Sequence, residues 1–134
     1  MSKPLIICII DDDDVYQYTI TNAIKKNSIV KKILVFSDGK EGIDFLIANA
    51  KNTDKIPDLI FLDNFMPIVD GWEFLEQYKK IKSSIAKKTS IYMISSSVDP
   101  SDFDKASKIV EVEACISKPP SAEEVNKIIE LIAK

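Results

Sequence analysis

Residues 5–14 read LIICIIDDDD, a run of six apolar residues that ends in four aspartates. The apolar run is too short for a helix and is rich in isoleucine, so it predicts a buried β-strand. Four more short apolar runs occur along the chain, and we expect a strand in each of them: Ile33 to Phe36, Leu59 to Leu62, Ile91 to Ile94 and Ala114 to Ile116.

Segments with helical periodicity follow each of these runs. Two of them open with a capping box, formed by Asp14 with Gln17 and by Ser121 with Glu124. A strand followed by a helix, five times over, predicts an α/β fold in which helices cover both faces of a mostly parallel sheet. The other three helices are expected to begin at these positions: after Asp38, near Gly71, and at Asp99 followed by Pro100, the last with a thin apolar face.

The composition excludes several classes of function. The 134 residues contain no His, and all 18 basic residues are Lys, which removes His ligands, His bases and Arg clamps. A net charge of −3 argues against nucleic-acid binding, and no apolar run approaches the roughly 20 residues of a membrane span. Cys8 and Cys115 lie in apolar runs, where buried thiols in a reducing compartment are expected. We therefore expect one cytoplasmic domain over residues 1–134, with no nucleic-acid or membrane partner.

Polar residues that could carry chemistry follow four of the five predicted strands. In parallel sheets, ligands bind beyond the carboxyl ends of the strands, where such residues converge. Two acidic groups on adjacent strands repel each other unless a cation or a proton intervenes, and a hard cation with oxygen ligands fits them. Each residue alone has an ordinary explanation as a turn former or surface charge, but their combination does not. The strand ends carry, in order, Asp11 with Asp12, then Asp63, Ser95 and Lys118.

These motifs resemble those of the receiver domain of bacterial two-component response regulators. The resemblance extends from Leu5 to the end of the chain, and it implies a flavodoxin-like, doubly wound (βα)5 fold with strand order 2-1-3-4-5. The matching pieces are Ile9-Ile10-Asp11-Asp12, Pro57 through Asp63 running into Met66-Pro67 and Asp70-Gly71, Ile94-Ser95, and Lys118-Pro119.

The resemblance implies a role for each residue at the strand ends. Asp63 would accept a phosphoryl group from the phosphohistidine of a histidine kinase or a histidine phosphotransfer protein. Ser95 would be the switch hydroxyl, and Lys118 would pair with the phosphate, with a cis bond to Pro119. The cofactor would be Mg²⁺, and its ligands by position would be Asp12 directly, Asp11 through water, Asp63, and the backbone carbonyl of Phe65.

The resemblance also implies how the signal leaves the domain. Many relatives carry Tyr or Phe three residues before the Lys, an aromatic that responds to the switch hydroxyl, but this chain has Cys115 there. Transmission could therefore rely on the segment from Ser95 to Pro100 and on the weakly packed fourth helix. Without an output domain, we expect a downstream protein to bind the surface formed by the fourth helix, fifth strand and fifth helix.

Two alternatives stay open. A degenerate receiver would bind its partner without being phosphorylated, although all the acceptor positions are intact. A Mg²⁺-dependent phosphohydrolase of the haloacid dehalogenase kind also uses an Asp nucleophile at a strand end, and Asp11 to Asp14 contain its Asp-x-Asp pattern. That enzyme would leave Asp63 and Met66-Pro67 unexplained. We therefore expect a signalling protein that catalyses only its own phosphorylation and slow dephosphorylation.

Overall fold

The computed structural model describes residues 4–66, 68–95 and 100–134. Within these ranges, five parallel strands form one sheet in the order β2-β1-β3-β4-β5, which confirms the predicted fold class and strand order. The elements are β1 (Leu5–Ile10), α1 (Asp14–Lys25), β2 (Val30–Phe36), α2 (Gly39–Ala48), β3 (Leu59–Asp63), α3 (Gly71–Ile81), the short 3₁₀ helix η1 (Lys82–Ser84), β4 (Ser90–Ser95), α4 (Pro100–Ser107), β5 (Val112–Ser117) and α5 (Ala122–Ala133).

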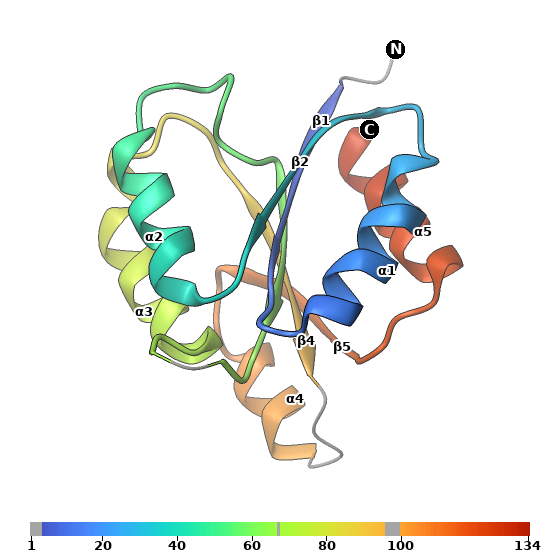
Figure 1. Ribbon diagram of the computed structural model, residues 1–134. Coiled ribbons are helices and arrows are strands. Elements are labelled where there is room, and N and C mark those ends of the chain that lie inside the picture. The colour runs from blue at the N-terminus through green and yellow to red at the C-terminus, as the bar shows by residue number, and fades with distance from the viewer. Residues whose placement is uncertain (1–3, 67, 96–99) are drawn as a thin grey trace.

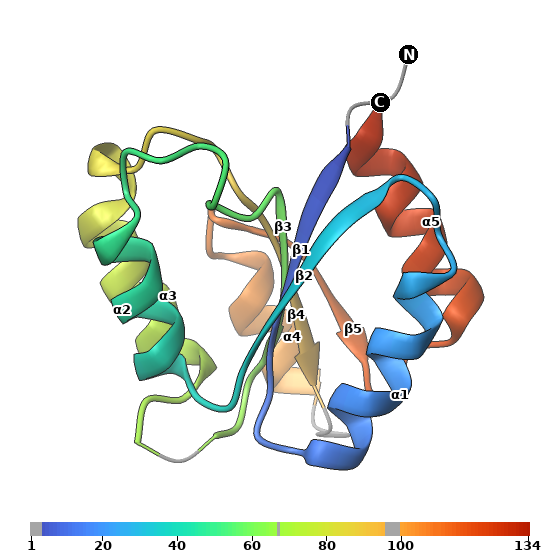
Figure 2. The ribbon, with the colours of Figure 1, turned by 45° about the horizontal axis from the view of Figure 1, so that its top comes forward.

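Helices cover both faces of the sheet, so that the molecule has three layers (Figure 1). Helices α1 and α5 pack on one face through an apolar cluster that includes Ile20, Ile24 and Ile129. Helices α2, α3 and α4 cover the other face, where Leu46 and Phe74 are buried together with Ala106 of α4 (Figure 2). The carboxyl ends of the strands all lie at the lower end of the sheet in Figure 1.

The three central strands are buried because helices lie on both of their sides. All six residues of β1 and all five of β3 are buried, which explains why both strands read as continuous apolar runs. The edge strands differ from the prediction. β2 begins at Val30 and β5 at Val112, earlier than the predicted starts at Ile33 and Ala114. Their first residues pair with β1 and β4 through the backbone, which does not require apolar side chains.

The helix caps agree with the sequence at α2, α3 and α5. The side chains of Asp38, Asp70 and Ser121 each accept a hydrogen bond from the backbone N–H three residues later, at 2.9, 2.9 and 3.0 Å. Asp99, the expected cap of α4, lies outside the described residues. The thin apolar face of α4 is confirmed, since Ala106 is its one buried residue in the part of the helix described.

The predicted cap of α1 is wrong by one residue. Asp13, not Asp14, is the N-cap, and its Oδ1 accepts hydrogen bonds from the N–H groups of Val15 and Tyr16 at 3.0 and 3.1 Å. The Asp13 N–H in turn donates to Asp11 Oδ1 at 2.9 Å, which bends the chain directly after β1. Gln17 forms no capping box, because its side-chain amide donates to the carbonyl oxygen of Asp11 instead.

The structure also bears on the predictions made for the two cysteines and for membrane-spanning segments. Cys8 is buried, Cys115 is half-buried, and both are free thiols. Among the residues that the structure describes, no helix combines the length and the apolar character that a bilayer span needs.

Candidate functional site

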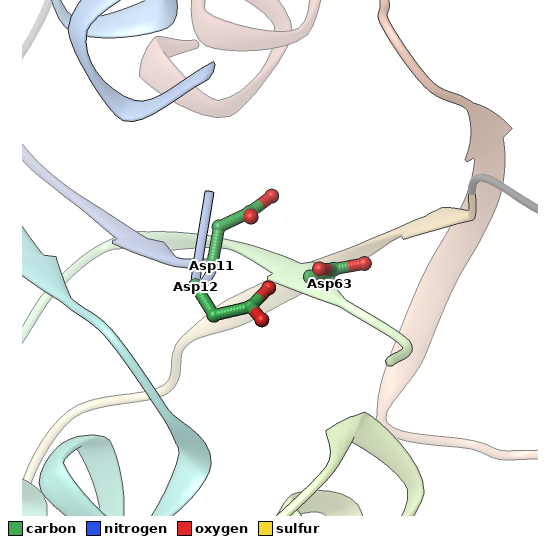
Figure 3. A group of neighbouring side chains, drawn as sticks. All are labelled: Asp11, Asp12 and Asp63. Carbon is green, nitrogen blue, oxygen red and sulfur yellow. The ribbon is translucent and has the colours of Figure 1, made fainter. Parts of the chain in front are cut away.

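Three aspartates converge at the carboxyl ends of β1 and β3 (Figure 3). One carboxylate oxygen from each of Asp11, Asp12 and Asp63 lies within 4.8 Å of the others, and we call this group the acidic site. Asp11 and Asp63 are buried, with 1% and 3% of their surfaces exposed, whereas Asp12 is open to solvent. The predicted acidic cluster therefore forms, with two buried carboxylates and one that is exposed to solvent.

Backbone contacts hold the two buried aspartates in place. The Asp11 N–H donates to the carbonyl oxygen of Phe36 at the end of β2, at 3.0 Å. The Phe65 N–H approaches Asp63 Oδ1 at 3.4 Å. Gly71 passes so close to Asp63 that a Cβ atom added to the glycine would lie 2.4 Å from the Asp63 carbonyl oxygen. The Asp70-Gly71 motif thus allows α3 to begin directly against the strand end that carries Asp63.

Lys118 brings a positive charge to the same place. Its Nζ lies 3.0 Å from Asp11 Oδ2 and 3.7 Å from Asp63 Oδ2. The Lys118 N–H donates to the carbonyl oxygen of Ser95 at 2.9 Å, and the peptide bond from Lys118 to Pro119 is cis, as expected. Burial lowers the pKa of Lys118, but the hydrogen bond to Asp11 and the charge of Asp63 outweigh it, so the pKa is raised. Lys118 is therefore a cation at neutral pH.

The acidic site carries excess negative charge even with Lys118 present. Burial, followed by the charge of Asp11, raises the pKa of Asp63 to about 7. Burial is also the main cause that raises the pKa of Asp11, against the opposing effects of the Asp13 N–H and Lys118. A hard divalent cation would stabilise the ionised forms of both carboxyl groups, because such a cation favours oxygen ligands. The donor set therefore fits Mg²⁺.

Tyr16 is part of the site, although its sequence position indicated only an apolar helix face. The residue is 8% exposed, and Lys118 Nζ lies 4.6 Å from the centre of its ring. The Tyr16 hydroxyl has no hydrogen-bond partner among the described residues. Burial, and then the charges of Asp11 and Asp63, raise the pKa of this hydroxyl. The neutral ring thus lies over the ammonium group that contacts both buried aspartates.

Ser95 ends β4 at the same edge of the sheet and is 1% exposed. Its Oγ accepts a hydrogen bond from Asn64 Nδ2 at 3.2 Å and donates to Asp102 Oδ2 at 3.4 Å. Asn64 Nδ2 also donates to Asp102 Oδ2, at 3.0 Å. Sequence reasoning missed both partners. Asn64 was visible as a polar residue directly after Asp63, but Asp102 is indistinguishable from an ordinary acid in the first turn of a helix.

Other predicted residues of the segment after β3 are placed as follows. The Phe65 side chain is 76% exposed, so only its backbone faces the acidic site through the N–H contact with Asp63. Met66 is 5% exposed. Pro67 lies outside the described residues, as do positions 96–99 of the predicted transmission segment.

Comparisons with known proteins agree on the family. The family model of the response regulator receiver domain matches residues 7–130. The protein PilG of Pseudomonas aeruginosa is 34% identical over 125 residues, which cover 92% of this chain and 84% of PilG. A probable methanogenesis regulatory protein, FilR2 of Methanothrix harundinacea, is 26% identical over 96% of this chain and 81% of its own length.

Solved structures give the same result. A two-component response regulator from Cytophaga hutchinsonii superimposes with a TM-score of 0.84 at 28% identity, over 97% of both chains. The receiver domain of the Arabidopsis thaliana histidine kinase CKI1, solved with Mg²⁺ and BeF₃⁻, superimposes with a TM-score of 0.75 at 23% identity, over 96% of this chain and 91% of that one. With the family model covering nearly all of its length, this chain belongs to the response regulator receiver domain family.

Proposed function

We propose that Asp63 accepts a phosphoryl group from a phosphohistidine, on a histidine kinase or a histidine phosphotransfer protein, in a reaction that requires Mg²⁺. Receiver domains are signalling proteins that interact with partners of these two kinds. The observation that carries the proposal is the convergence of Asp11, Asp12 and Asp63 with the Lys118 ammonium group at one edge of the sheet. These 134 residues contain no His, so the phosphohistidine donor must lie outside them.

The residues of the acidic site would hold the cation. Asp12 and Asp63 would offer carboxylate oxygens, Asp11 would bind through water, and the carbonyl of Phe65 would complete the protein ligands. When bound, Mg²⁺ would supply positive charge to the oxygens of the phosphoryl group. In support, the related Arabidopsis receiver domain was solved with Mg²⁺ and BeF₃⁻.

The chemistry asked of the chain is positioning and charge compensation. An Asp63 carboxylate oxygen attacks phosphorus while the phosphorus–nitrogen bond of the donor breaks, and the donor imidazole keeps the electron pair. Lys118, 3.7 Å from Asp63 Oδ2, is placed to pair with a phosphoryl oxygen. The Ser95 hydroxyl at the neighbouring strand end can donate a hydrogen bond to another. The product is an acyl phosphate, which holds the signal until water hydrolyses it.

Phosphorylation by acetyl phosphate tests the proposal without knowledge of the kinase. The chain is incubated with acetyl phosphate and Mg²⁺, and its intact mass is measured. We expect one added phosphoryl group, which is lost in Asp63→Asn and when EDTA is present. Mg²⁺ binding without an adduct would instead indicate a receiver that acts without phosphorylation, and turnover of phosphate esters would indicate a phosphohydrolase.

The output surface is proposed to lie over α4, β5 and α5. β5 is an edge strand that pairs only with β4 within the described sheet, so its outer edge is open to a partner. Chemical-shift mapping with a candidate target would test this assignment. The single-domain interpretation of residues 1–134 stays a prediction, which the intact mass of the native protein would test.

A further inference from the structure

Ser95, Asn64 and Asp102 form a hydrogen-bonded triangle that joins the ends of β3 and β4 to the first turn of α4. The Asn64 amide donates to both other members, at 3.2 Å to the Ser95 hydroxyl and 3.0 Å to Asp102 Oδ2. Asn64 is 7% exposed and follows Asp63 directly in the chain. We call this triangle the Ser95 latch, because it ties the residue beside Asp63 to a helix on the surface.

The bonds of the latch differ in strength. The bond from Asn64 to Asp102 has an ordinary length and a charged acceptor, which makes it the stronger contact. The bond from Ser95 to Asp102, at 3.4 Å, is longer than a normal hydroxyl hydrogen bond and therefore weak. A Ser hydroxyl carries only one proton to donate. Ser95 can therefore donate to Asp102 or to a phosphoryl oxygen, but not to both.

Helix α4 packs on the sheet through a narrow apolar face. Ala106 is its buried residue, and Lys105 Nζ lies 4.3 Å from the centre of the Trp72 ring on α3. Burial, and then the charge of Asp102, raise the pKa of the Cys115 thiol on β5. The latch thus connects the strand ends to α4.

We propose that Asp102 competes with a phosphoryl group on Asp63 for the Ser95 hydroxyl proton, so that phosphorylation breaks the two Ser95 bonds of the latch and loosens its hold on α4. The proposal rests on the proposed function of Asp63. When Ser95 turns to the phosphoryl group, Asp102 loses one donor and Asn64 loses one acceptor. Asp102 and Asn64 are then positioning residues, which act on the site through Ser95.

The latch and a phosphoryl analogue at Asp63 compete for Ser95. Removal of the latch should therefore make the protein bind the analogue more tightly. BeF₃⁻ with Mg²⁺ serves as the probe, as a stable stand-in for the phosphoryl group. Amide signals of α4 and the indole signal of Trp72, which is the only Trp of the chain, report the position of the helix in NMR spectra.

Four variants separate the latch from a general effect of charge. Asp102→Ala removes the acceptor, and Asp102→Asn keeps an acceptor oxygen but loses the charge. Asp104→Ala is the matched control, because it removes an exposed acid from the same helix. The Asp104 carboxylate pairs with Lys108 Nζ at 3.3 Å. Ser95→Ala removes the donor.

In the wild type, we expect BeF₃⁻ to shift the signals of α4 and Trp72. In Asp102→Ala, the same signals should already be displaced in that direction without BeF₃⁻, and BeF₃⁻ should bind about threefold to tenfold more tightly, as expected for one weak or average hydrogen bond. Asp102→Asn should have signal positions and a BeF₃⁻ affinity between those of the wild type and Asp102→Ala. Asp104→Ala should match the wild type in both. Ser95→Ala removes the same two bonds, so its α4 signals should already be displaced without BeF₃⁻ and should shift little further when BeF₃⁻ binds.

The outcomes distinguish the two proposals. If the wild type takes up BeF₃⁻ while the α4 signals stay in place, or if Asp102→Ala matches Asp104→Ala, the latch is wrong and the function of Asp63 stands. If the wild type binds no BeF₃⁻ and accepts no phosphoryl group from acetyl phosphate, the function proposed for Asp63 is wrong and the latch falls with it.

Discussion

At the scale of single residues, the charge of Asp63 couples folding to pH. The pKa of its buried carboxyl is raised to about 7, above the value of about 4 in an unfolded chain. Between these pH values the folded state holds more protons than the unfolded state, so the free energy of unfolding falls as pH rises. Asn does not titrate. Without divalent cations, Asp63→Asn should therefore be more stable than the wild type by roughly 1–3 kcal/mol at about pH 8, and by little at about pH 4.

Urea denaturation in EDTA at the two pH values measures this difference. Asp54→Asn is the matched control, because it makes the same chemical change at an exposed position. An advantage of Asp63→Asn that stayed constant with pH would contradict the raised pKa as its cause.

The ring of Tyr16 lies 4.6 Å from Lys118 Nζ, and we expect this cation–π contact to hold the ammonium group in place. Tyr16→Phe keeps the ring and removes a buried hydroxyl without a partner in the described chain, so it should preserve both stability and phosphorylation rate. Tyr16→Leu loses the ring and should slow phosphorylation by acetyl phosphate about three- to tenfold. Initial rates from intact mass, at matched thermal stability, measure the effect. Equal rates in Phe and Leu variants would rule out a role for the ring.

Ile68, in the segment between β3 and α3, has a φ of 66°, the one positive φ at a non-glycine residue in the described ranges. The left-handed conformation costs roughly 1–2 kcal/mol for a residue with a Cβ, and β-branching adds to it. The side chain is 73% exposed, so its removal loses little burial. Ile68→Gly should therefore raise the free energy of unfolding by about 0.5–1 kcal/mol, after the greater chain entropy of Gly is subtracted. Ile68→Val, still β-branched, should show no gain in the same denaturant titration.

At the scale of elements, an ion pair fastens the amino ends of the strands, opposite the acidic site. Lys87, before β4, lies with its Nζ 3.0 Å from Asp58 Oδ1, while Asp58 Oδ2 accepts the Ile6 N–H of β1 at 2.8 Å. Lys87 also donates to the carbonyl oxygen of Ile56, at 2.8 Å. Both side chains of the pair are largely buried, at 13% and 9% exposure.

Removal of one partner leaves the other charge buried, so Lys87→Met should destabilise the protein by about 2–3 kcal/mol. The neighbouring Lys88 is exposed, and Lys88→Met should cost less than about 0.5 kcal/mol. Chemical denaturation of both variants gives the comparison. Similar losses in the two would show that the pair does not fasten the strands.

At the scale of the whole molecule, an ion that binds the assembled acidic site must stabilise the fold, because the three carboxylates come together only in the folded chain. Mg²⁺ at 100 times its dissociation constant should add about 2.7 kcal/mol and raise the Tm by several degrees. Thermal scans with and without Mg²⁺, at constant ionic strength, measure the shift. Asp12→Asn should lose most of it. A shift of the same size in that variant would place the ion elsewhere.

The fold class follows from the sequence alone, because five short apolar runs separated by helical segments leave a doubly wound parallel sheet as the consistent arrangement. It also predicted that Asp11, Asp12, Asp63 and Lys118 would converge, since the carboxyl ends of parallel strands share one edge. The starts of β2 and β5 were less predictable, because exposed residues such as Lys32 pair only through their backbone.

The contacts between side chains of different elements could not be predicted from the sequence. Asp102 reaches Asn64 although 38 positions separate them, and Tyr16 lies against Lys118 from the other end of the chain. In the turn after β1, the Asp13 N–H likewise donates to Asp11, and Asp13 caps α1 in place of the expected Asp14. Spacing along the chain predicts the elements and their exposed faces. Contacts between elements depend on how helices lie on the sheet, which is set by the packing of the whole core.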